Sequence, residues 1–158
     1  MSQVVASEIK LYKSDSADSD GGDISANEIV DETLNNVFPD VSGDDTATGL
    51  VTYRKIFIKN TNATESLDAL KVWIEQLTDS TEDEIDISMC NTLTGSDATG
   101  DGQNYVRPTS VVHADVLEYG EVVAGDYAAL WLRRTVDGGA SEYEENSAIL
   151  GMSTTYTL

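Results

Sequence analysis

The sequence has little of what catalytic and metal-binding sites require. It contains one cysteine and one histidine, Cys90 and His113, which lie far apart in the chain. A single cysteine excludes an intramolecular disulfide and a zinc site built from several cysteines. One histidine is a poor basis for a catalytic triad, and we interpret Cys90 as a buried or edge thiol at the end of a strand. We therefore expect no enzyme activity, no catalytic residues and no cofactor.

Basic residues are also scarce. Lys and Arg number 9 against 29 Asp and Glu, which gives a formal charge of −20 at pH 7. Such a chain repels nucleic-acid phosphates, so we expect no nucleic-acid partner. The acidity is typical of a highly soluble protein, or of one adapted to high salt or binding cations in its acidic loops.

Long apolar runs are missing too. No stretch approaches the ~20 apolar residues of a membrane-spanning helix. The first residues have neither the basic segment nor the long apolar run of a signal peptide. We expect no association with a membrane.

What the sequence does have is alternation of apolar and polar residues in runs bounded by polar loops, which is typical of β-strands. Residues 50–60 place Ile56 and Ile58 on one face, with Tyr53 and Phe57 on the other. Further strands are predicted within residues 9–13, 67–76, 85–90 and 127–136, with a last strand or two in 143–156. Apolar side chains that share one face of these strands are Leu70, Val72, Ile74, Ala128, Leu130 and Leu132.

These runs recur at intervals of roughly 10–20 residues, which suits an antiparallel sandwich. We predict an all-β fold, an antiparallel β-sandwich of Ig-like or jelly-roll-like type with long acidic loops. The length of 158 residues fits a single domain, residues 1–158. Within it, we expect residues 1–49 to form an extended arm plus an irregular segment.

Three segments have weaker signals. Ser25 followed by Glu28 resembles a capping box and predicts a short helical turn. Residues 41–49 are interpreted as an acidic turn region. Residues 109–115 are interpreted as a further strand.

Acidic loops raise the question of calcium. A helix-loop-helix calcium site needs ligands at set positions and a Glu at position 12, and the segment that starts at Asp97 has Pro108 there. We therefore assign no metal site, although an irregular loop site remains an alternative. It would use Asp15, Asp18, Asp20 and Asp23.

Charged residues inside strands also carry predictions. We expect Lys55, Lys59 and Lys71 to pair with carboxylates on neighbouring strands. Arg133 and Arg134 are adjacent, so they point to opposite faces, and one of them faces a neighbouring carboxylate or else solvent. Asn62-Ala63-Thr64 matches a glycosylation sequon, but we interpret it as a turn.

Two regions together resemble a known class. Residues 52–62 (TYRKIFIKNTN) with 70–74 (LKVWI), and residues 125–140 (GDYAALWLRRTVDGGA), are similar to small virion structural proteins of tailed bacteriophages. Those proteins carry a Y-R-x-I-[FY]-[IV]-K-N strand before a K-V-W-I strand, and a W-[IL]-R-R-T-V-x-x-G-A strand near the C-terminus. The short L-Y-x-S run and the later N-N-V-F-P-D-V turn agree with this class.

The resemblance implies a non-enzymatic virion protein made in the host cytoplasm and carried on the outer surface of the particle. Its implied role is a capsid decoration or cement protein that bridges major capsid protein subunits, as a homo-oligomer such as a trimer. One alternative is a structural or adaptor protein of the tail or baseplate, with tail proteins as partners. Another is a glycan- or calcium-dependent module that adheres to the host surface.

Overall fold

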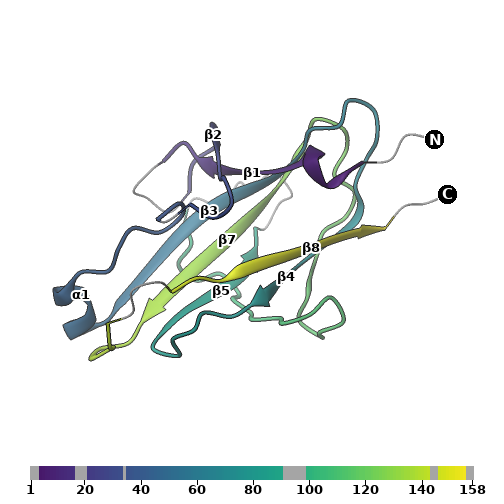
Figure 1. Cartoon of the computed structure of the whole chain (residues 1–158). Coiled ribbons are helices and arrows are strands. Elements are labelled where there is room, and N and C mark those ends of the chain that lie inside the picture. The colour runs from purple at the N-terminus through teal and green to yellow at the C-terminus, as the bar shows by residue number, and fades with distance from the viewer. Residues whose placement is uncertain (1–3, 17–20, 34, 91–98, 143–145, 156–158) are drawn as a thin grey trace.

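The computed structural model describes residues 4–16, 21–33, 35–90, 99–142 and 146–155. Its strands are β1 (Ile9–Ser14), β2 (Ile24–Glu28), β3 (Leu50–Asn60), β4 (Asp68–Gln76), β5 (Asp83–Met89), β6 (Leu117–Glu118), β7 (Tyr127–Val136) and β8 (Ile149–Thr155) (Figure 1). Helix in this part of the chain is limited to a 3₁₀ turn, η1 (Ala6–Glu8), and a short α-helix, α1 (Gly43–Thr48). All strand pairs are antiparallel, so the prediction of an all-β fold is confirmed. Neither helical element could span a bilayer.

The larger sheet has five strands in the order β2-β1-β3-β7-β5. Its centre is the pair β3 and β7, which is in register from Leu50 opposite Val136 to Lys59 opposite Tyr127. Both strands are rich in β-branched and aromatic residues, which pack well on a pleated surface. The two strands run side by side through the middle of the molecule in Figure 1.

The smaller sheet has three strands in the order β6-β4-β8. Trp73 of β4 lies opposite Gly151 of β8, and its ring covers that glycine so closely that a Cβ at position 151 would overlap the indole. The indole Nε1 of Trp73 donates a hydrogen bond to the Glu75 carboxylate. Close approach of a ring to the backbone explains why glycine stands inside a strand.

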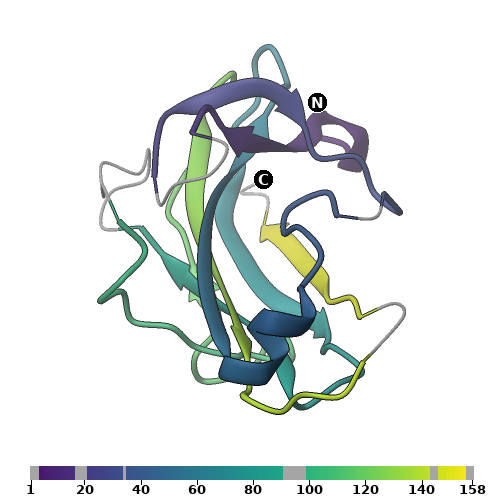
Figure 2. The same cartoon turned by 90° about the vertical axis from the view of Figure 1, so that its left-hand side faces the viewer.

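The apolar faces of both sheets contribute to one hydrophobic core. In Figure 2 β8, drawn in yellow, lies to the right of β3 and β7, and the core fills the space between the sheets. The predicted apolar faces are confirmed by the buried residues Ile56, Ile58, Leu70, Val72, Ile74, Ala128, Leu130 and Leu132. Burying one such aliphatic side chain stabilises the fold by about 1.5–3 kcal/mol.

A second, smaller cluster lies on the other face of the larger sheet. Phe57, Trp131 and Cys90 are buried there, with tyrosines including Tyr53 packed around them. This confirms the prediction that Tyr53 and Phe57 point away from Ile56 and Ile58, as the two-residue period of a strand requires.

Residues 24–28 form β2, so the predicted helical turn at Ser25 is wrong. The Ser25 hydroxyl donates to the Lys13 carbonyl at 2.9 Å, and the Glu28 carboxylate accepts from Lys10 Nζ at 2.9 Å. Both partners belong to β1. The two side chains that a capping box would need are therefore engaged across the strands.

The prediction of a simple acidic turn at residues 41–49 is also wrong, because this region contains α1. Ser42 Oγ accepts from the Asp45 N–H at 3.2 Å, and the Asp45 carboxylate accepts from the Ser42 N–H at 3.1 Å. These hydrogen bonds from Ser42 lower the pKa of Asp45. The reciprocal pair is a capping box in which Asp takes the place of Glu.

Residues 109–115 form turns, so the strand predicted there is wrong. The His113 N–H donates to the Ser110 carbonyl at 3.1 Å, and the Val116 N–H donates to the His113 carbonyl at 3.1 Å. Val112 is 87% exposed. The two adjacent valines in this segment therefore do not fill a strand position in the core.

The segment predicted as an arm plus irregular chain contributes to the sheet. β1 pairs with β3 from Ile9 opposite Asn60 to Lys13 opposite Ile56, and β2 follows at the edge. Val4 is buried in the main core. Residues 4–14 are therefore held by backbone hydrogen bonds and apolar packing.

Candidate functional site

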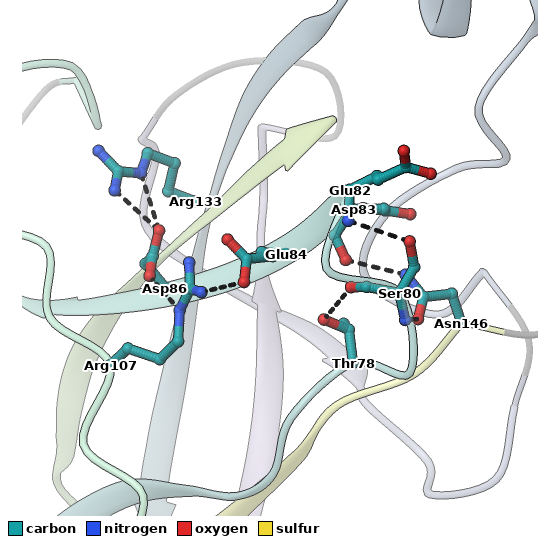
Figure 3. Close-up of polar contacts among 9 residues, drawn as sticks. All are labelled: Thr78, Ser80, Glu82, Asp83, Glu84, Asp86, Arg107, Arg133 and Asn146. Atoms are coloured by element: carbon teal, nitrogen blue, oxygen red, sulfur yellow. Dashed lines mark hydrogen bonds and ion pairs between the residues drawn. The ribbon is translucent and has the colours of Figure 1, made fainter. Parts of the chain in front are cut away.

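The most concentrated group of charged contacts lies on β5 and β7. We call Asp83, Glu84, Asp86, Arg107, Arg133 and Arg134 the arginine–carboxylate network. Asp86 is its centre, only 6% exposed, and it accepts from Arg107 Nε at 2.7 Å and from Arg133 Nη2 at 2.7 Å (Figure 3). Arg107 also pairs with Glu84. Burial alone lowers the pKa of Arg107, but its hydrogen bonds to Asp86 and Glu84 outweigh burial and raise it.

Strand geometry places most of this group. Glu84 and Asp86 are two residues apart and share one face of β5, and Asp86 lies directly opposite Arg133 of β7. Arg107 comes from a loop that is held on β5 because Val106 and Ile87 exchange backbone hydrogen bonds of 2.8 and 3.0 Å. The alternation of acidic and apolar residues in 84–86 is visible in the sequence. The contact of Arg107 with these carboxylates could not be predicted from it.

Arg134 forms the corresponding pair on the opposite face. Its Nε and Nη2 bind the Asp83 carboxylate at 2.8 and 2.6 Å, and its Nη1 donates to the Pro39 carbonyl at 2.9 Å. Burial raises the pKa of Asp83, but hydrogen bonds from Arg134 and Asn146 lower it more, so the net shift is downward. The opposite orientation of Arg133 and Arg134 is confirmed, and each of them faces a carboxylate of β5.

A third set of hydrogen bonds fixes the turn before β5. Ser80 Oγ accepts from the Glu82 N–H at 3.1 Å, and the Ser80 N–H donates to Asn146 Oδ1 at 3.2 Å. Asn146 Nδ2 donates to the Asp83 carbonyl at 2.9 Å, and Thr78 Oγ1 donates to the Ser80 carbonyl at 3.1 Å. Figure 3 shows Asn146 from the segment before β8 reaching this turn.

Aromatic rings continue the site across β7 and β3. The Arg133 guanidinium lies 4.6 Å from the centre of the Tyr105 ring, which is 5.9 Å from the Tyr53 ring. The Tyr105 hydroxyl donates to the Gly100 carbonyl at 2.9 Å. Beneath them Trp131 is fully buried, and its indole Nε1 has no hydrogen-bond partner among the described residues.

The predicted lysine pairs have different outcomes. Lys71 pairs with Glu118 at 3.7 Å, as predicted. Lys55 is buried, and its ammonium lies 5.6 Å from the Trp131 ring and donates to the Gly22 carbonyl at 3.3 Å. Lys59 lies over an aromatic ring of β1. The ammonium groups of both lysines therefore make cation–π contacts.

Cys90 and His113 have separate environments. Cys90 is 5% exposed and packs in the aromatic cluster with Phe57 and Trp131, which confirms the interpretation of a buried thiol. His113 lies in a turn, where its Nδ1 accepts from the Asp115 N–H at 3.2 Å.

The acidic loop considered for calcium is only partly described. Asp15 Oδ1 accepts the backbone N–H of Asp23 at 2.9 Å, while Asp18, Asp20 and Asp97 lie outside the described residues. No cluster of three or more His, Cys, Asp or Glu within the described ranges is arranged to hold a metal ion.

The sequon residue Asn62 lies in a turn, as predicted. It is 6% exposed, its Oδ1 accepts from the N–H groups of Thr64 and Glu65 at 2.8 Å each, and its Nδ2 donates to Glu8 at 2.9 Å. The amide nitrogen therefore serves in the local fold.

The arginine–carboxylate network neutralises charge and fastens loops to the sheet. Its arginines bind carboxylates or carbonyls of the same chain. The network therefore holds loops of the chain against the larger sheet. No family model, no curated protein and no solved structure matches the chain.

Proposed function

We propose that the chain is a non-enzymatic structural protein of a tailed-phage virion, most specifically a capsid decoration or cement protein. It would bridge adjacent major capsid protein subunits on the outer shell. The observation that carries this proposal is the place of the two motifs that resemble such proteins. Residues 52–60 and 127–136 lie in β3 and β7, the central strands of the larger sheet. The resemblance therefore concerns the strands around which the sheet is assembled.

The fastened loops support a mechanical role. Arg107 ties its loop to β5, and Arg134 ties the chain at Pro39 to the same sheet. Separating the two charges of a partly buried ion pair leaves each without its counter-ion and costs stability. The intact ion pairs therefore favour a single geometry of the loops that they hold. A protein that holds a shell against internal pressure benefits from such loops.

The net charge supports an exterior position. A chain with a formal charge of −20 is repelled by packaged DNA. Many copies that each bind weakly to neighbouring capsid subunits would hold the shell by avidity.

The strand order favours an Ig-like sandwich with acidic loops over a jelly roll. In an Ig-like domain the first, second, fifth and fourth strands share one sheet, and the third and sixth pair in the other. Here β1-β3-β7-β5 and the pair β4-β8 follow that pattern when the two short strands β2 and β6 are set aside.

The decisive experiment combines quantification of the protein in purified particles with its localisation in a reconstruction of the particle. Hundreds of copies on the outer shell would support the decoration role, and particles without the protein should assemble but burst at a lower temperature. Tens of copies or fewer at the tail would replace this role with that of a tail or baseplate adaptor. Absence from particles, with binding of the isolated chain to glycans or a calcium-dependent rise in Tm, would overturn both in favour of an adhesion module.

A further inference from the structure

In the part of the chain that the structure describes, three of the four sheet edges are protected against pairing with another chain. β6 has only two residues, and β2 has five with an irregular register against β1. β5 carries three carboxylates and is covered by Val106, which exchanges two backbone hydrogen bonds with Ile87. Short strands, irregularities, charges and covering segments are the means by which proteins block sheet edges.

The fourth edge, β8, is longer than β2 and β6 and, among the described residues, has no charge and no covering segment. Its pairing with β4 shifts register at both ends because β4 has the extra residues there, but it is continuous from Leu150 to Ser153. β8 is seven residues long and pairs with β4 on one side. The sequence from 146 to 158 contains no charged residue and no proline. Residues 149–154 are all at least partly exposed, and Ile149 is 50% exposed. We call residues 149–153 the β8 edge.

The side chains of the β8 edge alternate in a way that suits an additional strand. Leu150 and Met152 point inward and pack on the main core, yet both remain partly exposed. Gly151 and Ser153 occupy the outward positions and are small. A strand added here would cover Leu150 and Met152, provided that its own inward residues are apolar.

We propose that the β8 edge pairs antiparallel with the β8 edge of a second copy of this chain. The two three-stranded sheets then join into one continuous sheet around a two-fold axis. In the proposed register, Gly151 lies opposite the partner's Gly151. Leu150 then lies opposite the partner's Met152, and Ile149 lies opposite the partner's Ser153, twice by symmetry.

Charge favours this edge over the other surfaces for contact between two copies. A chain with a formal charge of −20 repels another copy at most surfaces, but the β8 edge is neutral. The nearest charged strand, β4, would lie three strand spacings, or about 14 Å, from β4 of the partner, which exceeds the Debye length of about 8 Å at physiological salt. A two-fold pairing also closes the β8 edge of both copies, so that no further copy can add there.

This dimer does not rest on the virion role, because it is a property of the isolated chain. It differs from the trimer that the resemblance implies. The mass of the isolated protein in solution distinguishes a dimer from a trimer.

The test is the mass of the full chain by sedimentation equilibrium over a wide concentration range, at low and at physiological salt. We expect twice the 17.0 kDa of one chain, with association strengthened by salt because the chains repel each other. A variant with Ile149→Lys and Ser153→Lys sets like charges opposite each other and should weaken association by about tenfold or more. A variant with Ile149→Lys and Ser153→Glu sets opposite charges there and should restore the dimer.

The control is Leu77→Lys with Val123→Lys, which changes the net charge equally at two exposed apolar residues outside β8. It should remain dimeric. Circular dichroism verifies that each variant is folded, and hydrogen exchange on the unmodified chain should show protection of residues 149–153 that rises with protein concentration. A monomer at every concentration, a trimer, or a dimer that survives both lysines would overturn the proposal.

Discussion

Gly151 leaves no room for a side chain, because the Trp73 ring lies against its backbone. Gly151→Ala should lower the free energy of unfolding by about 1–3 kcal/mol, since the ring must shift out of its packed position. Urea denaturation measures this change. The matched control is Gly43→Ala, where no atom lies within 4 Å of the added methyl group and alanine favours the helix. Equal effects at both positions would contradict the packing argument.

Asp86 binds two arginines and is nearly inaccessible to water, whereas Glu84 binds one and is more exposed. Asp86→Asn should therefore lower the free energy of unfolding by about 3 kcal/mol, because it leaves Arg107 and Arg133 without their shared carboxylate. Glu84→Gln should cost about 1 kcal/mol or less. Chemical denaturation of the two variants compares them directly, and a larger loss for Glu84→Gln would reverse the assignment of Asp86 as the centre.

Asp83 links stability to pH. Its pKa is lowered in the folded chain, so the unfolded chain binds more protons as the pH falls below the ordinary aspartate value of about 3.9. The stabilisation is present above that value and is lost as the pH falls toward the folded pKa. Asp83→Asn should flatten this part of the acid-unfolding curve. Asp79→Asn, which removes the same charge at an exposed aspartate nearby, is the variant for comparison. Thermal melts from about pH 5 downward, through the ordinary aspartate pKa, test this.

At the scale of elements, α1 depends on its N-cap residue, Ser42. This six-residue helix buries no side chain, so its capping box supplies much of its local stability. Ser42→Ala should lower the free energy of unfolding by about 1 kcal/mol through loss of the Asp45 N–H hydrogen bond. Thr81→Ala, an exposed loop substitution, is the control and should change it by less than about 0.5 kcal/mol. Equal stability of the Ser42 variant would mean that α1 is held by its neighbours alone.

Local patterns identified the strands better than the turns between them. The period of two in residues 50–60 and 127–136 specified both faces of β3 and β7, because alternate burial follows from strand geometry alone. The patterns at Ser25 and at residues 109–115 were misleading. Each had a local signal, but β1 engaged Ser25 and Glu28, and turn hydrogen bonds closed the second segment.

For the molecule as a whole, net charge opposes compactness. Between about 10 mM and 150 mM salt the Debye length falls from about 30 to 8 Å, which screens repulsion among the acidic side chains. We expect Tm to rise over this range, because a formal charge of −20 outweighs the few ion pairs that salt weakens. NaCl and KCl should act equally. A fall in Tm would show that the ion pairs dominate, and a difference between the two salts would indicate a specifically bound cation.

The sequence by itself determined the all-β class, the inward and outward faces of the central strands, and the opposite orientation of Arg133 and Arg134. These properties follow from the two-residue period, which depends only on the local backbone. Only the tertiary structure decided that β7 lies between β3 and β5, that Arg107 reaches Asp86, and that β8 forms an edge. The packing of the two sheets determines which distant segments become partners. A local periodicity cannot predict which strands will pair.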